Sequence, residues 1–341
     1  MAIDTPLKPR VFVTSRLPSA ALEPLWTSCD VDYRDDSEPC SREELLRRVR
    51  AADGLICLLT DTIDREVIAA GEKLRVIADV AVGYNNVDVA AARERGIVVT
   101  NTPDVLTDAT ADLTLGLMLG IMRRLVEGDR LIRRNGWTGF RFTFMLGADP
   151  RGKQLGILGL GRIGQAVARR AVPFGMSIAY VPSPRAAKQP GGAPRKFEGF
   201  EATPMGFDEL IATSDVVSIH VPLNDGTRHL IDQRALARMK RSAYLVNVSR
   251  GPVVDEEALA WALREGVISG AALDVFEHEP TVHPDLLTLE NVMLVPHLGS
   301  ATRETRTAMA GLAVRNCMNV LAGESPVTPV PEMRLSAAGQ A

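Results

Sequence analysis

Short apolar runs alternate with helix-like segments along most of this sequence. The runs "GLICLLT" (54–60) and "LRVIADVAVG" (74–83) are apolar at successive positions rather than at every second one. The helix-like segment "SREELLRRVRAA" (41–52) before them begins with a capping box, with Ser41 as N-cap and Glu44 three residues later. A strand that is apolar on both faces is typical of a parallel sheet that helices cover on both sides. The sequence therefore predicts an α/β fold built on parallel sheets.

The alternating pattern divides into two runs. The first covers residues 1 to about 101, and the second begins after "GADPRGKQ" (147–154) and continues to about residue 298. Between them lies "TDATADLTLGLMLGIMRRLVEGDRLIRRNG" (107–136), whose apolar residues recur at helical spacing. We expect one long helix here, which bridges two domains or packs on a second subunit. A further long helix is expected from Ala301 to about Gly323.

Composition and charge exclude several classes of protein. The net charge of −3 gives no electrostatic case for a nucleic-acid partner, and no apolar run is long enough to cross a membrane. The N-terminus has no apolar signal-peptide core. The four cysteines lack the spacing of metal ligands or of a disulfide framework. We therefore expect a cytoplasmic protein with reduced thiols, no bound metal and no membrane partner.

A glycine motif opens the second run. In "KQLGILGLGRIGQAVARR", Gly159, Gly161 and Gly164 form a GxGxxG motif between an apolar strand and an amphipathic helix. The first glycine permits a tight turn, the second lets a pyrophosphate approach the backbone, and the third lets helix and strand pack closely. The N–H groups at the helix start, around Arg162 and Ile163, would face the phosphates. The motif predicts dinucleotide binding, and the alternative is an ordinary glycine-rich turn.

The segment after the motif bears on which dinucleotide binds. An NAD site normally places an acidic side chain about 20 residues on, at the end of the next strand. No Asp or Glu occurs from Gly164 to Lys196, and Val181 occupies the expected acidic position, followed by Ser183 and Arg185. The planar fork of Arg185 could bind a 2′-phosphate, although it could also be a solvated surface residue. We therefore expect NADP(H) to be preferred, with NAD(H) possible.

Three chemically distinct side chains follow three later strands. Arg250 ends "AYLVNVSRG", Glu279 follows "AALDV", and His297 ends "NVMLVPH". Because ligands bind at the carboxyl ends of parallel strands, these side chains could converge on one point. Each one alone could be structural, as a loop-capping arginine or a packed histidine. His220, inside its strand, is expected to be packed in this way.

The segments around these residues carry a family resemblance. "VNVSRGPVVDEEAL", "AALDVFEHEP" and "LVPHLGSAT", together with "AVGYNNVDVAAARERGI" and "TADLTLGLML", resemble the D-isomer-specific 2-hydroxyacid dehydrogenases, most of all the glyoxylate/hydroxypyruvate reductases. The resemblance implies a homodimer of chains with two Rossmann/flavodoxin-like domains and an active site in the cleft between them. It assigns residues 1–101 with 299–330 to a substrate-binding domain. Residues 102–298, including a linking helix at about 107–135, would bind the dinucleotide.

The resemblance also implies a reaction, the NAD(P)H-dependent reduction of glyoxylate or hydroxypyruvate to glycolate or D-glycerate. Arg250 would bind the carboxylate and carbonyl of the 2-oxo acid, and His297 would donate the proton. Glu279, hydrogen-bonded to the other ring nitrogen of His297, would fix its tautomer. Two rivals remain: a 2-ketogluconate or broader 2-oxo acid reductase, and a nucleotide-sensing, corepressor-like binding protein. His278 and His283, in a proline-containing loop, are rival acids that we expect to be solvated instead.

Further roles follow from the same resemblance. The N–H groups of Val82 and Gly83 would bind the substrate carboxylate. Phe140 stands where related reductases often place a tryptophan that reaches the neighbouring subunit's site. The residues assigned to the nicotinamide end of the cofactor are Pro222, Val248, Ser249, Asp274 and Gly299.

Overall fold

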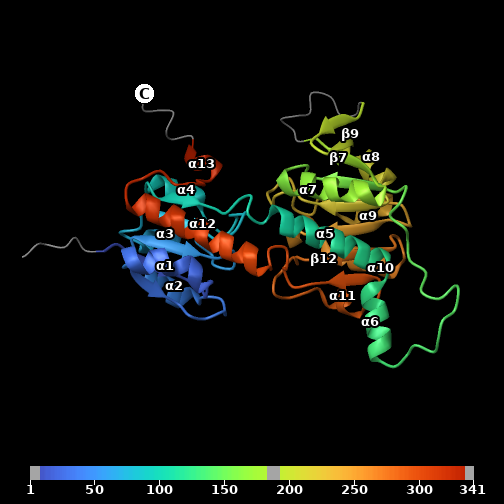
Figure 1. The fold of residues 1–341 in the computed structure, drawn as a ribbon, viewed down its shortest axis with the longest axis horizontal. Helices are drawn as coiled ribbons and strands as arrows, with labels where there is room; N and C mark the ends of the chain where they lie inside the picture. The colour runs from blue at the N-terminus through green and yellow to red at the C-terminus, as the bar shows by residue number, and fades with distance from the viewer. Residues whose placement is uncertain (1–7, 183–192, 335–341) are drawn as a thin grey trace, which may run out of the picture. The chain divides into compact units, whose positions relative to one another are not determined.

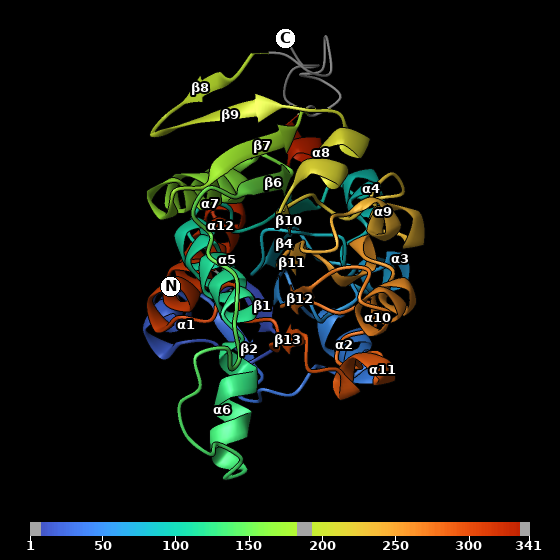
Figure 2. The same ribbon diagram turned by 90° about the vertical axis from the view of Figure 1, so that its right-hand side faces the viewer.

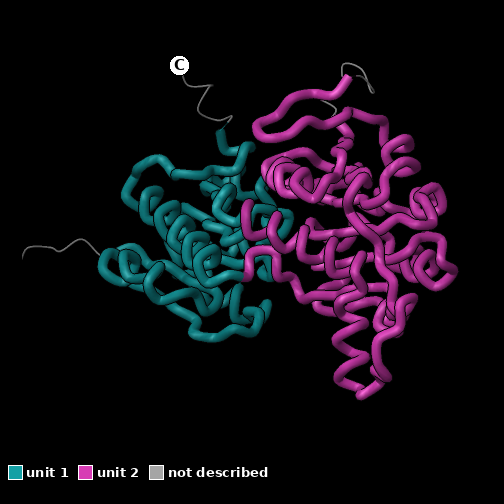
Figure 3. The backbone as a smooth tube through the Cα atoms, turned by 45° about the vertical axis from the view of Figure 1, so that its right-hand side comes forward, with its two compact units in different colours: residues 1–106, 302–341 teal, residues 107–301 magenta. Residues whose placement is uncertain are grey.

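The computed structural model describes residues 8–182 and 193–334. The chain divides into two compact units (Figure 3), unit 1 with residues 1–106 and 302–341 and unit 2 with residues 107–301. Each unit contains a sheet of mainly parallel strands with helices on both faces, so the predicted α/β class is confirmed. No helix within the described residues combines the length and apolar character needed to cross a bilayer.

Unit 1 is built on a five-stranded sheet in which every neighbouring pair is parallel. All positions of the strands at residues 54–57 and 76–79 are buried, as their continuous apolar runs predict. In sheet order the strands are β2 (Asp30–Tyr33), β1 (Arg10–Val13), β3 (Gly54–Cys57), β4 (Val76–Asp79) and β5 (Val98–Thr100).

Helices cover both faces of this sheet (Figure 1). The last long helix, α12, packs against α1 and β4, and the Arg75 guanidinium binds the carbonyls of Val320 and Leu321 at the C-terminal end of α12. The helices of unit 1 are α1 (Ser19–Ser28), α2 (Arg42–Val49), α3 (Arg65–Ala70), α4 (Val89–Glu94), α12 (Arg303–Leu321) and α13 (Pro331–Arg334).

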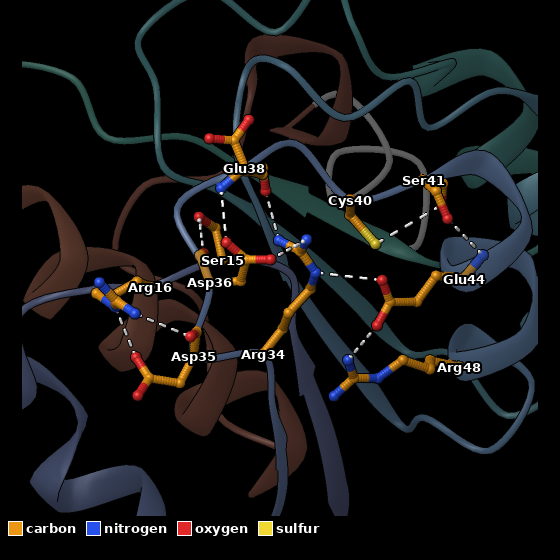
Figure 4. Close-up of polar contacts among 10 residues, drawn as sticks. All are labelled: Ser15, Arg16, Arg34, Asp35, Asp36, Glu38, Cys40, Ser41, Glu44 and Arg48. Carbon is orange, nitrogen blue, oxygen red and sulfur yellow. Dashed lines mark hydrogen bonds and ion pairs between the residues drawn. The ribbon is translucent and has the colours of Figure 1, made fainter.

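The capping box predicted at the start of α2 forms only in part. Ser41 Oγ accepts the N–H of Glu44 at 3.2 Å, as expected. The Glu44 carboxylate does not return to the N–H of Ser41 but binds Arg34 at 3.2 Å and Arg48 at 2.7 Å (Figure 4). Arg34 also binds Asp36 at 2.8 Å, so the loop after β2 is attached to the start of α2 by ion pairs.

Unit 2 is built on an eight-stranded sheet, parallel except for the β8–β9 hairpin at one edge. The chain begins the sheet at β6 and adds strands on both sides of it, so β6 and β10 flank a topological switch point. In sheet order the strands are β13 (Val292–Leu294), β12 (Gly270–Leu273), β11 (Tyr244–Asn247), β10 (Val216–Ile219), β6 (Gln154–Leu158), β7 (Ser177–Val181), β9 (Phe200–Pro204) and β8 (Arg195–Phe197).

The helices of unit 2 form a layer on each face of this sheet (Figure 2). On one face α5 (Thr107–Met122) packs against α7 (Arg162–Ala171). The other face carries α8 (Phe207–Thr213), α9 (Gln233–Arg238) and α10 (Glu256–Arg264). The remaining helical segments are α6 (Leu125–Arg133), α11 (Pro284–Thr288) and the 3₁₀ turns η1 (Val172–Phe174) and η2 (Gly251–Val253).

The expectation of one long helix over 107–136 is wrong. Helix α5 ends at Met122, Arg124 adopts a left-handed φ of 55°, and α6 then begins. The carbonyl of Met122 accepts the N–H of Ala148 at 2.8 Å, so it is not used to continue the helix. The side chain of Arg124 binds Glu127 through two hydrogen bonds of 2.7 and 2.6 Å. The pattern of apolar residues does not reveal this break, because the hydrogen bond at the end of α5 is donated by Ala148, which is distant in the sequence.

Candidate active site

The glycine motif forms the loop between β6 and α7, and each glycine meets a different constraint. Gly159 has a φ of +94°, and a Cβ there would lie 2.7 Å from the carbonyl carbon of His220. A Cβ on Gly164 would lie 2.3 Å from the oxygen of Gly159, so helix and strand are in close contact. Around Gly161, by contrast, no described residue other than its neighbours along the chain lies within 4 Å of an added Cβ. The backbone at Gly161 can therefore be approached closely by a ligand.

The start of α7 fits a phosphate group. Gly161 is its N-cap residue, and within the described residues no side chain caps the helix there. Arg162 is exposed and Ile163 is half-buried at this N-terminus. Uncapped N–H groups at a helix N-terminus carry partial positive charge and bind anions. The loop thus has the geometry that a pyrophosphate requires.

The strand that normally supplies the acidic residue of an NAD site is β7, which ends at Val181. Val181 is half-buried and packs at the edge of the apolar core. Ser183 and Arg185, the residues expected to contact a 2′-phosphate, lie outside the described residues.

Glu279 and His297, from the loops after β12 and β13, form a hydrogen-bonded pair. His297 Nδ1 lies 2.9 Å from Glu279 Oε2, and their side chains are 28% and 32% exposed. Burial disfavours the charged form of Glu279, but His297, the N–H of Phe276 and the charge of Arg250 together outweigh burial and lower the pKa of the Glu279 carboxyl. Arg250, which follows β11, is thus one of the charges that favour ionised Glu279.

Arg250 lies on a turn that is fixed from both sides. Asn247, the last residue of β11, donates Nδ2 to the carbonyl of Arg250 at 3.0 Å and accepts the N–H of Ser249 at 3.1 Å. On the other side, a Cβ on Gly251 would lie 1.8 Å from the carbonyl of Phe276. Only glycine allows the Arg250 segment to pack directly on the backbone of the loop that carries Glu279.

The backbone of the His297 loop is bound by Asp274, which follows β12. The carbonyl of Asp274 accepts the N–H of His297 at 2.9 Å, and His297 has a left-handed φ of 53°, uncommon for a residue other than glycine. The Asp274 side chain is 1% exposed, and its carboxylate accepts the N–H groups of Leu298 and Gly299. Burial, the largest effect, raises the pKa of Asp274 in spite of these hydrogen bonds.

The family resemblance assigns Asp274 and Gly299 to the nicotinamide end of the cofactor, and the structure adds a contact of Gly299 that was not predicted. The N–H of Gly299 is bound by Asp274, and its carbonyl accepts Thr110 Oγ1 at 3.1 Å. Pro222 and Val248 follow β10 and β11 at the same edge of the sheet, with Pro222 exposed. The residues assigned to the cofactor in unit 2 therefore follow adjacent parallel strands.

The other histidines differ from His297 in their surroundings. His220 follows β10, lies 2.8 Å from Ser218 Oγ, and burial lowers its pKa to about 3, which keeps the ring neutral. It therefore lies just after its strand rather than inside it as expected, and it is half-buried. His278 is exposed, as expected. His283 was expected to be solvated, and this expectation is wrong for its Nδ1 atom. That atom is buried and has no hydrogen-bond partner within the described residues.

In unit 1, the loop after β4 presents backbone N–H groups. The carbonyl of Val82 accepts Asn101 Nδ2 at 2.7 Å, and the carbonyl of Ala81 accepts the N–H of Thr102 at 2.7 Å. Asn86 Nδ2 binds the carbonyls of Leu58 and Asp61, both at 3.1 Å. The N–H groups of Val82 and Gly83 make no hydrogen bond with any described residue. They are available to a carboxylate, which is the role expected for them.

Comparisons with known proteins identify the family of this chain. Residues 115–299 match the model of the D-isomer specific 2-hydroxyacid dehydrogenase NAD binding domain. A glyoxylate reductase of Korarchaeum cryptofilum is 48% identical over 323 residues, which cover 94% of this chain and 95% of that protein.

Two solved structures are also similar. A glyoxylate reductase from Paecilomyes thermophila has a TM-score of 0.82 and 35% identity, covering 96% of this chain and 100% of that one. An NADPH-dependent glyoxylate/hydroxypyruvate reductase from Sinorhizobium meliloti, in complex with NADP and malonate, has a TM-score of 0.81 and 35% identity, covering 95% and 97%.

Proposed function

Because this chain belongs to the D-isomer-specific 2-hydroxyacid dehydrogenases, we propose that it reduces glyoxylate to glycolate with a nicotinamide cofactor. The observation that carries the proposal is the hydrogen bond between His297 and Glu279 beside the charge of Arg250. These groups supply a proton donor, a residue that orients it, and a cation for the carboxylate and carbonyl of a 2-oxo acid.

The protein side of the reaction follows from these three side chains. The guanidinium of Arg250 binds the oxygen atoms of the substrate with its planar fork, and it stabilises negative charge that develops on the carbonyl oxygen. Glu279 accepts Nδ1–H of His297, which fixes the ring so that Nε2–H donates to that oxygen. The cofactor, when bound, supplies the hydride that adds to C2. One hydride and one proton convert the 2-oxo acid to the 2-hydroxy acid.

The Gly159–Gly164 loop and the N-terminus of α7 would bind the pyrophosphate of the cofactor. Pro222, Val248, Ser249, Asp274 and Gly299 would surround its nicotinamide end. We propose a preference for NADP(H), with NAD(H) as a weaker cofactor, because Val181 replaces the acidic residue that grips a ribose 2′-OH and Arg185 follows soon after. The Sinorhizobium meliloti reductase, named as NADPH-dependent, supports this preference.

On the substrate side, the N–H groups of Val82 and Gly83 would bind a substrate carboxylate. We propose hydroxypyruvate, reduced to D-glycerate, as a second substrate, since the Sinorhizobium meliloti relative is named for both. The same carboxylate and carbonyl groups are present in both compounds, so Arg250 and His297 meet them in the same way.

We also propose that the chain is a cytoplasmic homodimer. No residue of α6, all of which is described, is buried, and Trp137, Phe140, Phe142 and Leu146 in the segment that follows are all more than half exposed, Phe140 at 84%. An exposed apolar surface of this kind is typical of a protein interface. The four cysteines are free thiols, which suits a reducing compartment.

A panel of 2-oxo acids, assayed with NADPH and with NADH, tests substrate and cofactor together. The oxidation of the cofactor is measured with glyoxylate, hydroxypyruvate and 2-ketogluconate. We expect the highest kcat/KM for glyoxylate with NADPH. Equal or better use of NADH would reverse the cofactor preference, and failure to oxidise either cofactor with any of the acids would contradict the proposed function.

A further inference from the structure

The loop that carries Glu279 is hydrogen-bonded to a second carboxylate, that of Glu256, which has no role in the proposed reaction. Glu256, the first residue of α10, is only 4% exposed. Its Oε1 accepts the N–H of Glu277 at 2.7 Å, and its Oε2 accepts the N–H of His283 at 3.2 Å. One buried carboxylate therefore fixes two points of the loop, and Glu279 lies between them.

The same loop is also bound from the side of Arg250. His229 Nε2 lies 2.5 Å from Glu277 Oε1, and the N–H of His229 donates to the carbonyl of Pro252 at 2.8 Å. Gly251 packs on the backbone of Phe276, as described above. The turn after Arg250 and the loop of Glu279 are thus connected on two sides, and Glu256 belongs to the helix that begins soon after that turn.

Both oxygens of Glu256 are needed for this arrangement. A buried carboxylate is stable only where hydrogen bonds replace its hydration, and here two backbone N–H groups do so. A glutamine of the same shape has one acceptor oxygen, and its NH₂ group would face the second N–H without bonding to it. An alanine would leave both N–H groups without their partner.

We propose that Glu256 is a positioning residue for the Glu279–His297 pair. Its carboxylate fixes the N–H groups of Glu277 and His283, and the loop between them then directs Glu279 Oε2 toward His297 Nδ1. The inference rests on the proposed function only in taking this pair as the proton donor. The placement of Glu279 by Glu256 does not depend on which acid is reduced.

Glu256→Gln is compared with Glu257→Gln, its exposed neighbour in the same first turn of α10. Both changes remove one negative charge, but only the first removes an acceptor from the Glu279 loop. Loss of a residue that orients a functional side chain typically costs ~10–100-fold, and we expect Glu256→Gln to lower kcat by about that factor with KM within about twofold of wild type. The acidic limb of its kcat–pH profile should also move to higher pH, because a misplaced Glu279 loses the hydrogen bond to His297 that helps to lower its pKa.

A readout that needs no turnover separates this proposal from the proposed function. In cofactor-free protein, the hydrogen bond to Glu279 should give His297 Nδ1–H a downfield proton NMR resonance. We expect that resonance in wild type and Glu257→Gln, and its loss in Glu256→Gln. A protein that reduces no 2-oxo acid but shows this pattern contradicts the proposed function and supports the role of Glu256.

Glu256→Asp, which keeps the charge but has a shorter reach, covers the case in which the glutamine variant does not fold. One of the two hydrogen bonds should be lost, so we expect a smaller fall in kcat and a weaker resonance. A folded variant at Glu256, glutamine or aspartate, that keeps both the wild-type pH profile and the wild-type resonance would overturn the proposal.

Discussion

Two loops of this molecule, one in each unit, differ in which backbone groups are hydrogen-bonded: carbonyls in the first loop and N–H groups in the second. After β4 in unit 1, the carbonyls of Ala81 and Val82 are bound by donors, and the N–H groups of Val82 and Gly83 have no partner within the described residues. After β13 in unit 2, the N–H groups of His297, Leu298 and Gly299 are bound by Asp274. The first loop leaves backbone N–H groups without a described partner, whereas in the second loop these groups are bound and the side chain of His297 contacts Glu279.

This difference predicts different responses to mutation. A loop that binds through N–H groups depends on the residues that fix its carbonyls, and its own side chains are secondary. A loop that acts through one side chain depends on that side chain and on the groups that orient it. Mutations should therefore affect mainly KM when they disturb the loop after β4 and mainly kcat when they disturb the loop after β13.

The largest effect is expected for His297→Ala. Removing a general acid typically costs ~10²–10⁴-fold, so kcat should fall by about that factor while KM changes little. Steady-state kinetics with glyoxylate measures both. His278→Ala, a change at an exposed histidine of unit 2, should behave as wild type. Near-normal turnover of His297→Ala would mean that the proton comes from elsewhere.

Arg250→Lys should be the next most harmful change. The lysine keeps the charge but not the planar fork that binds two oxygens at once, so substrate and transition state are both bound less well. We expect kcat/KM to fall by ~10²–10³-fold, with a rise in KM and a fall in kcat. An effect on KM alone would show that Arg250 binds the substrate without stabilising the developing charge.

A smaller effect, confined to KM, is expected for Asn101→Ala in unit 1. The variant loses the donor to the Val82 carbonyl, so the N–H groups of Val82 and Gly83 are less well fixed. Such a hydrogen bond contributes ~1 kcal/mol, which corresponds to a rise in KM of roughly five- to tenfold with kcat nearly unchanged. A fall in kcat without a change in KM would contradict the contrast between the two loops.

The parts of this candidate site that act through side chains could be predicted from the sequence. Arg250, Glu279 and His297 lie in the loops that follow three apolar strands, and Glu279 and His297 are in contact. The glycine motif is also visible in the sequence, because the spacing of its glycines is typical of one backbone conformation. The N–H groups of Val82 and Gly83 carry no such mark, and only the family resemblance pointed to them.

What the sequence did not predict depends on contacts between distant segments. Glu256 and Glu257 are indistinguishable as acidic residues of a first helical turn, and only the packing of the 275–283 loop buries the first and leaves the second exposed. The break between α5 and α6 is a similar case, since the N–H of Ala148 takes the carbonyl of Met122. The spacing of apolar residues along the chain predicts neither the burial of Glu256 nor the hydrogen bond between Ala148 and Met122.

The smallest expected effect uses pH to distinguish the charged partner of the His297 loop, Glu279, from the uncharged partner of the loop after β4, Asn101. The folded-state pKa of Glu279 lies below its unfolded value, so ionised Glu279 stabilises the fold above the unfolded pKa of about 4.3, and this stabilisation is lost as pH falls through the folded pKa. The difference in free energy of unfolding between wild type and Glu279→Gln, from urea titrations, should therefore shrink between about pH 5.5 and pH 3. Asn101 does not titrate, so the destabilisation in Asn101→Ala should stay constant over that range. A constant difference for Glu279→Gln as well would show that His297 and Arg250 do not favour its charged form.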